Sequence, residues 1–179
     1  MEASALRSLS ACCLSPIGPI RITGTANGIS EIVFARRNDP DAGRTPDELI
    51  PAVRQLEEYF RGERREFTVR LATAGTVFQK RVWTELGKIP FGATATYGGI
   101  AAAMDRPGAA RAVGRANHLN PAAIVIPCHR VIGANSELMG YGGGLWRKRW
   151  LLEHERSVAL IGAAAAGRAR LEKSPGRRT

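Results

Sequence analysis

One stretch of the chain, Pro127-Cys128-His129-Arg130-Val131, places a thiol next to an imidazole and a guanidinium. It follows the apolar run 122–126, which we interpret as a short buried strand ended by the proline, because proline has no N–H to give to a neighbouring strand. A cysteine reacts as its thiolate, and cationic neighbours lower the thiol pKa from its free value of about 8.5. We therefore expect Cys128 to be a nucleophile. The alternative is a buried cysteine that only fills space, as free cysteines commonly do.

Composition and charge narrow the class of protein. The 179 residues are 44% hydrophobic and 23% charged, which suits a globular protein of one larger domain or two small ones. The net charge of +10 favours a polyanionic partner. Nucleic acid is the first candidate and an anionic membrane the second, although a basic surface can also serve solubility alone.

The cysteines and the hydropathy pattern bear on location. Cys12, Cys13 and Cys128 form no disulfide framework, because their number is odd and two are adjacent. No apolar run approaches the roughly 20 residues that span a bilayer. The N-terminus shows no signal-peptide core. We expect a cytoplasmic, reducing location.

The first part of the chain, residues 1–73, predicts a small antiparallel sheet with one helix. Alternating or β-rich runs predict strands over residues 14–23, 29–34 and 66–71. Asn27-Gly28 is a hairpin turn signal between the first two, and the polar residues 38–44 predict a loop.

The helix of this part has start and stop signals. Thr45-Pro46-Asp47-Glu48 has the pattern of a capping box with proline at the first helical position, and Gly62 is placed to end the helix. Its buried face is expected at the apolar positions with helical spacing, which are Leu49, Val53, Leu56 and Phe60.

After a linker at residues 72–75, a second capping box opens a helix at Thr76. Residues 97–104 and 109–118 then predict two short helices joined by a tight turn. This is the layout of a helix-turn-helix, and Arg111, Arg115 and His118 share the outer face of its second helix. An ordinary helical hairpin with a solvated basic face is the alternative.

A last helix is predicted over residues 145–155. Lys148, Leu151 or Leu152, and Glu155 fall on one of its faces. A carboxylate on an otherwise apolar face requires a partner, and His129 is the candidate. The preceding glycine-rich residues 140–144 lack the lysine of a phosphate-binding loop.

These motifs, taken in order, resemble the O6-alkylguanine-DNA alkyltransferases, also called methylated-DNA–protein-cysteine methyltransferases. The resemblance is strong over residues 75–156 and holds only in outline before them. The residues that carry it are Gly75-Thr76-Val77-Phe78-Gln79, Ile89-Pro90-Phe91-Gly92, Thr96-Tyr97, Arg111-Ala112-Val113-Gly114, Asn117, Asn120-Pro121, Ile126-Pro127-Cys128-His129-Arg130-Val131-Ile132-Gly133, Gly140-Tyr141, Gly143-Gly144, Lys148 and Leu151-Leu152-Glu153-His154-Glu155.

The resemblance implies a DNA repair protein that flips O6-alkylguanine out of the duplex and moves the alkyl group irreversibly to its own Cys128, a single-turnover transferase. In the family, the histidine here numbered His129 acts as a base through a water, and the glutamate here numbered Glu155 orients it. Tyr97 matches a proton donor to guanine N3, and Arg111 an arginine that fills the gap in the base stack. The remaining matches are Asn120 as a structural hinge and Val131, Tyr141 and Gly142, with Tyr97, as the alkylguanine pocket.

The resemblance also implies how the protein meets DNA. Family members bind the minor groove with the helix-turn-helix, and the small residues Ala109, Ala110 and Gly114 would allow close approach beside Arg115. A non-catalytic module that only binds the lesion is the alternative function. We expect no cofactor and no metal, because no histidine precedes His118 and a Cys/His zinc site lacks its ligands. We expect a monomer.

The expected fold is therefore α+β, with a ribonuclease H-like N-terminal domain and a mainly helical C-terminal domain with short strands. We place the N-terminal domain at residues 1–73, the alkyltransferase and DNA-binding domain at residues 74–158, and a basic disordered tail at residues 159–179.

Overall fold

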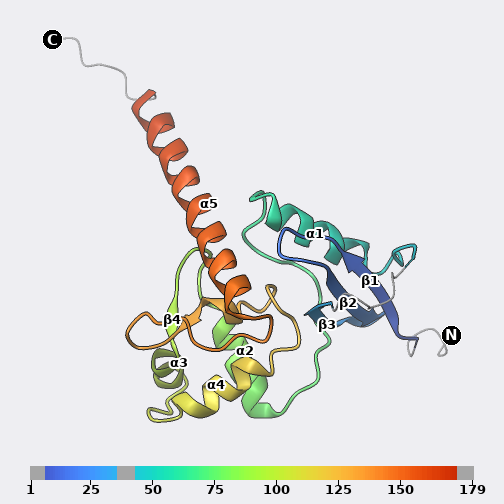
Figure 1. The fold of residues 1–179 in the computed structure, drawn as a ribbon, viewed down its shortest axis with the longest axis horizontal. Coiled ribbons are helices and arrows are strands. Elements are labelled where there is room, and N and C mark those ends of the chain that lie inside the picture. Colours follow the sequence, from blue (N-terminus) through green and yellow to red (C-terminus); the bar gives the residue numbers. More distant parts are fainter. Residues whose placement is uncertain (1–6, 36–42, 173–179) are drawn as a thin grey trace.

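The computed structural model describes residues 7–35 and 43–172, which form two lobes (Figure 1). In the N-terminal lobe a three-stranded antiparallel sheet, in the order β1-β2-β3, packs against one helix. Its elements are β1 (Leu9–Cys13), β2 (Ile20–Thr25), β3 (Gly28–Phe34) and α1 (Ile50–Phe60). Residues of β2 alternate between buried and half-buried, as a strand with one face on the core requires. The predicted α+β class is confirmed.

The hairpin between β2 and β3 is also confirmed. Thr25 lies opposite Gly28, so the turn residues are Ala26 and Asn27, one position earlier than predicted. Gly28 has φ +131°, and a Cβ there would lie 2.6 Å from the carbonyl oxygen of Arg70. Only glycine fits both the backbone angle and this close approach.

The prediction of a third strand over residues 66–71 is wrong. That segment forms a single bridge, at Leu71, with hydrogen bonds from Ile29 N to Arg70 O and from Ala72 N to Ile29 O. Further along, the same edge of β3 is occupied by residues 121–123, since Ile32 N donates to Pro121 O and Ala123 N donates to Ile32 O. The third strand is β1 instead, which includes Cys12 and Cys13. The predicted loop at 38–44 lies mostly outside the described residues.

Helix α1 starts later than its sequence pattern predicts. Its N-cap is Leu49, without a side-chain cap, because residues 46–49 form a separate turn and Pro51 occupies the first helical turn, where a missing N–H costs nothing. Gly62, at φ +77°, ends the helix as predicted. Of the predicted buried face, Leu49 and Leu56 are fully buried and Val53 and Phe60 are half-buried, and Tyr59 adds to this face.

The C-terminal lobe is mainly helical. Its elements are α2 (Val77–Gly87), β4 (Ala95–Thr96), α3 (Tyr97–Ala103), α4 (Ala110–His118), the 3₁₀ turn η1 (Cys128–Arg130), β5 (Val131–Ile132) and α5 (Leu145–Glu172). The capping box at Thr76 is confirmed, because Thr76 Oγ1 accepts from Gln79 N and Gln79 Oε1 accepts from Thr76 N. Trp83 Nε1 donates to Ala116 O at 2.9 Å and so joins α2 to α4. The two short helices α3 and α4 pack together as predicted.

The strand predicted before Cys128 is absent. Ile124 has φ +73°, and the amides of Val125 and Ile126 donate to Ala123 O and Ala122 O, so residues 122–126 make a tight turn with two isolated bridges. Cys128 then opens a 3₁₀ turn. Because that helix has about 3.0 residues per turn, neighbouring side chains do not alternate between opposite faces as they would in a strand.

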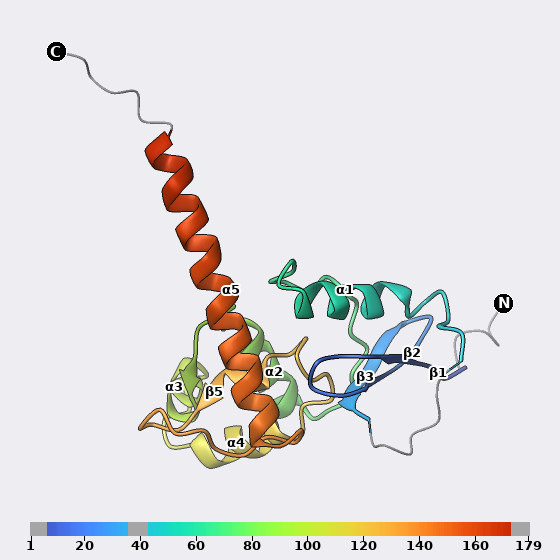
Figure 2. The same ribbon diagram turned by 45° about the horizontal axis from the view of Figure 1, so that its top comes forward.

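Helix α5 has 28 residues and runs far past the predicted end at residue 155. The C-terminal part of α5 extends past the C-terminal lobe and projects away from both lobes (Figures 1 and 2). The expectation of a disordered tail is therefore wrong for residues 159–172, where an alanine-rich run favours helix, and residues 173–179 lie outside the described part. Over the described residues, no helix combines the length and the apolar character needed to cross a membrane.

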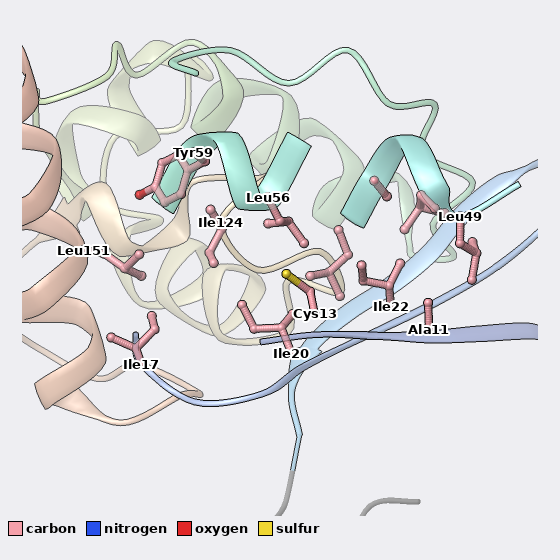
Figure 3. Packing of buried hydrophobic residues seen from close by; sticks show 13 residues of the cluster. Ala11, Cys13, Ile17, Ile20, Ile22, Leu49, Leu56, Tyr59, Ile124 and Leu151 are labelled. Atoms are coloured by element: carbon pink, nitrogen blue, oxygen red, sulfur yellow. The ribbon is translucent and has the colours of Figure 1, made fainter. Parts of the chain in front are cut away.

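The core of the N-terminal lobe reaches into the C-terminal lobe. Ile124, from the turn before the cysteine, and Leu151, from α5, are packed with Ile17, Ile20 and Tyr59 (Figure 3). All five side chains are almost fully buried. This apolar cluster therefore joins the two lobes, and the helices of the C-terminal lobe enclose a second cluster of their own.

Candidate active site around Cys128

Cys128 is buried, with 5% of its surface exposed, and lines a cavity of about 190 Å³. Three segments wall this cavity: the end of β3, the end of α4 and the loop 140–143. Both lobes thus contribute to the space in front of the thiol.

The electrostatics of the thiol differ from the prediction. Burial raises the pKa of Cys128 above 9.0, and the lowering influences are the Asn120 side chain, the charge of Lys148 and the backbone amides of Cys128 and His129. The side chains of His129 and Arg130, which we expected to lower this pKa, bind Glu155 instead. The cation that favours the thiolate is therefore Lys148.

Lys148 is itself buried and lies between two carbonyl groups. Its Nζ donates to Val131 O at 2.6 Å and to Met139 O at 2.7 Å. Burial lowers the pKa of Lys148 to about 8, and the neighbouring Cys128 opposes that shift. Lys148 therefore remains a cation below about pH 8 and connects the loop that walls the cavity to the segment after the cysteine.

Glu155 accepts five hydrogen bonds from the residues that the structure describes. Oε1 accepts from Tyr59 Oη, His129 Nε2 and Arg130 Nη2 at 2.8, 2.8 and 2.9 Å, and Oε2 accepts from Arg130 Nε at 2.9 Å and Gly92 N at 3.0 Å. Burial alone would raise the pKa of Glu155, but the hydrogen bond from His129 and the hydrogen bonds and charge of Arg130 hold it well below its usual range. The carboxylate is ionised throughout the physiological range.

This carboxylate fixes the proton on His129. An ionised carboxylate only accepts hydrogen bonds, so His129 Nε2 must carry the hydrogen and Nδ1 must hold the lone pair. Nδ1 is buried and has no hydrogen-bond partner among the described residues. Burial lowers the pKa of His129 below 6.5, which keeps the ring neutral. The structure thus presents a neutral imidazole with one unused acceptor next to Cys128 in the chain.

Tyr97 and Asn120 both lie near the cysteine segment. Tyr97 opens α3 directly after β4, which pairs with β5, and its pKa is raised by burial and by the neighbouring Cys128. Asn120 follows α4, donates from Nδ2 to Ile126 O at 2.8 Å and accepts from Ala122 N at 3.0 Å. These contacts join the end of α4 to the turn before Cys128.

The remaining candidate residues fall into two places. Tyr141 and Gly142 line the cavity, and the carbonyl group of Val131 faces Lys148. On α4, Arg111 and Arg115 are exposed, whereas Ala109, Ala110 and Gly114 are half-buried. The basic side chains therefore occupy the outer side of α4, as the spacing predicts, whereas Ala109 packs against the core of the C-terminal lobe. Among the described residues no group of three His, Cys, Asp or Glu side chains could hold a metal ion.

Two family models match the chain. The DNA binding domain of 6-O-methylguanine DNA methyltransferase matches residues 77–157, and the ribonuclease-like domain of the same protein matches residues 11–73. A methylated-DNA--protein-cysteine methyltransferase of Methanosarcina acetivorans is 49% identical over 148 residues, which are 80% of this chain and 95% of that protein. The chain belongs to the O6-methylguanine DNA methyltransferase family.

Solved structures agree with this membership. A crystal structure of the Mycobacterium tuberculosis O6-methylguanine methyltransferase has a TM-score of 0.75 at 47% identity and covers 84% of this chain and 94% of its own. A second crystal structure, in complex with DNA, has the same TM-score at 48% identity and covers 83% of this chain and 93% of its own. The part of α5 beyond residue 157 lies outside both family matches.

The sequence did not predict the place of two residues in this site, Tyr59 as a partner of Glu155 and Asn117 as a wall of the cavity. Tyr59 lies 96 residues before Glu155, and no local pattern connects them. Asn117 was noted only as part of the resemblance, yet its side chain is buried at the cavity. A polar residue on the buried face of α4, in line with Val113, was the one available signal.

Proposed function

We propose that this chain repairs O6-alkylguanine in duplex DNA by moving the alkyl group to Sγ of Cys128, once per chain. The proposal depends on one observation, a buried thiol that opens on a small cavity and lies beside a neutral histidine fixed by an ionised carboxylate. A lesion-binding module without catalysis needs neither the thiol nor the carboxylate. The names of the relatives, methylated-DNA--protein-cysteine methyltransferases, support the same reaction.

The transfer is a single displacement. The Cys128 thiolate attacks the alkyl carbon, the S–C bond forms, the C–O6 bond breaks, and its electron pair remains on guanine. The thiol proton leaves to Nδ1 of His129 through a water molecule, and Glu155 stabilises the resulting imidazolium. Lys148 favours the thiolate before the attack. The thioether has no route for further displacement, so the chain acts as a stoichiometric transferase.

Tyr97 and the cavity walls act on the base. We assign Tyr97 to donate a hydrogen bond or proton to guanine N3 as negative charge builds on the leaving base, and its raised pKa keeps the hydroxyl protonated until then. Val131, Tyr141 and Gly142 surround the extruded base in this proposal. Since a base inside a duplex cannot reach a protein thiol, extrusion has to come first.

Helix α4 meets the DNA in this proposal. The small residues Ala109, Ala110 and Gly114 let the helix approach the minor groove, Arg111 fills the gap left by the guanine, and Arg115 contacts phosphate. Asn120 acts as a hinge that keeps α4 and the cysteine turn in fixed relation. We propose that residues 74–158 hold all of the DNA-binding surface, residues 1–73 support it, and the chain works as a monomer in the reducing cytoplasm.

Titration with duplex DNA that contains O6-methylguanine tests the function. We expect methyl transfer to stop at one equivalent per chain, with an added methyl group located on the Cys128 peptide by mass spectrometry. Cys128→Ser should remove transfer, whereas Cys12→Ser, which changes a half-buried cysteine of β1, should not. Continued turnover, or transfer that persists in the Cys128→Ser protein, contradicts the proposal.

A further inference from the structure

The cavity in front of Cys128 has two buried polar atoms that the proposed reaction does not use. Oδ1 of Asn117 and the hydroxyl of Tyr141 are both buried and have no hydrogen-bond partner in the described part of the chain. Both residues line the cavity that contains Cys128. Buried polar atoms are almost always hydrogen-bonded in native proteins, and the exceptions call for an explanation, often a functional one.

The two atoms are complementary in type. Oδ1 of Asn117 accepts a hydrogen bond, and the Tyr141 hydroxyl can donate one, because burial raises its pKa well above 10.0 and keeps it protonated. A hydroxyl group both donates and accepts, so it offers the two kinds of hydrogen bond that these atoms lack. An apolar alkyl group satisfies neither atom.

We propose that Asn117 and Tyr141 make this cavity selective for O6-adducts that carry a hydroxyl group, such as O6-(2-hydroxyethyl)guanine. This inference depends on the proposed alkyl transfer to Cys128. During the displacement the attacked carbon lies between Sγ and O6, so the rest of the adduct must extend into the cavity. The hydroxyl then donates to Asn117 and accepts from Tyr141, while the bonds formed and broken are those of the methyl reaction, leaving an S-(2-hydroxyethyl) thioether.

The walls around these two atoms allow an adduct of this size. Gly142 has nothing within 4 Å of the position of a Cβ, so the loop leaves room at that point. Tyr141 is held in place by Phe34, with ring centroids 6.0 Å apart in an edge-to-face arrangement. The hydroxyl of Tyr141 is therefore a fixed donor rather than a mobile one.

The test compares two adducts of nearly equal size, O6-(2-hydroxyethyl)guanine and O6-propylguanine, with O6-methylguanine as the reference. Single-turnover rates are measured for the wild type, Asn117→Leu and Tyr141→Phe. In the wild type we expect hydroxyethyl transfer to exceed propyl transfer by about tenfold, the value of one hydrogen bond, and each variant should remove most of that ratio. Methyl transfer measured in the same variants reports any general loss of transfer, so the hydroxyethyl-to-propyl ratio isolates the contribution of the two polar atoms.

Ile32→Val is the matched control, because it changes the volume of the same cavity without changing the polarity of its walls. The hydroxyethyl-to-propyl rate ratio of this variant should equal that of the wild type. Asn117→Leu should also be at least as stable as the wild type in urea, since it removes an unpaired buried polar atom. Tyr141→Phe decides the test if Asn117→Leu does not fold. An unchanged ratio in both variants, or an equal fall for all three adducts, overturns the inference. Absence of methyl transfer in the wild type overturns the proposed function instead.

Discussion

Replacement of Glu155 by glutamine should destabilise the fold far more than most single amide substitutions. Glutamine keeps the shape and one acceptor oxygen, which can still bind Tyr59 and His129, but it removes the charge that pairs with Arg130. Arg130 is only 6% exposed, and its other hydrogen bond goes to Ile89 O. Removal of one partner of a buried ion pair costs about 3–5 kcal/mol. We expect a loss of about 3 kcal/mol, because part of the network survives.

Urea denaturation near neutral pH measures this loss, and Glu153→Gln serves as the control. Glu153 is exposed on the same helix, so its replacement should change stability by less than about 0.5 kcal/mol. The transfer rate of the Glu155→Gln protein should also fall by about a hundredfold, because the imidazolium that forms on His129 loses the negative charge that stabilises it.

The pH dependence gives a second check on the same reasoning. The folded pKa of Glu155 lies well below the unfolded value of 4.5, so its contribution is complete above pH 4.5 and is lost as the pH falls further. The stability gap between the wild type and Glu155→Gln should therefore shrink in acid. A gap under about 1 kcal/mol at neutral pH, or one that stays constant into acid, refutes the assigned role of this carboxylate.

Three further predictions concern the thiol, its support and the DNA. The transfer rate should rise from about pH 6 to 8, because burial keeps the Cys128 thiol mostly protonated in that range, and a flat single-turnover pH profile contradicts this expectation. Lys148→Met should lower the transfer rate at least tenfold, because the thiolate loses its neighbouring cation. Asn120→Ala should lower the unfolding free energy in urea by about 1–3 kcal/mol, because Ile126 O loses its donor, and a loss below about 0.5 kcal/mol contradicts that role. Arg115→Ala should weaken DNA binding and reduce the slope of log affinity against log salt by about 0.9, and an unchanged slope removes Arg115 from the phosphate contacts.

Some helix signals that act within one or two turns were predicted well, whereas the capping box predicted at Thr45 is wrong, because α1 begins only at Ile50. The capping box at Thr76 and the pair α3 and α4 appear where the sequence places them, because their hydrogen bonds and turns lie within a few residues. The pairing of Glu155 with His129 was also predicted, since a carboxylate on the buried face of a helix needs a partner.

Features that depend on distant residues were missed. Residues 66–71 have strand-like alternation, but whether they pair depends on the edge of β3, which residues 121–123 occupy at Ile32. The thiol pKa was misjudged because the side chains of His129 and Arg130 bind Glu155, and the effective cation, Lys148, lies 20 positions away from Cys128 along the chain. Tyr59 was missed for the same reason.

The hydrogen bond from Tyr59 to Glu155 restricts how a nucleotide can enter. Tyr59 belongs to α1, so the N-terminal lobe holds one corner of the carboxylate on which His129 depends. A hinged opening of the two lobes would break this hydrogen bond and expose the apolar cluster that contains Ile124 and Leu151. Admission of the purine must therefore leave the two lobes joined through Tyr59 and this cluster.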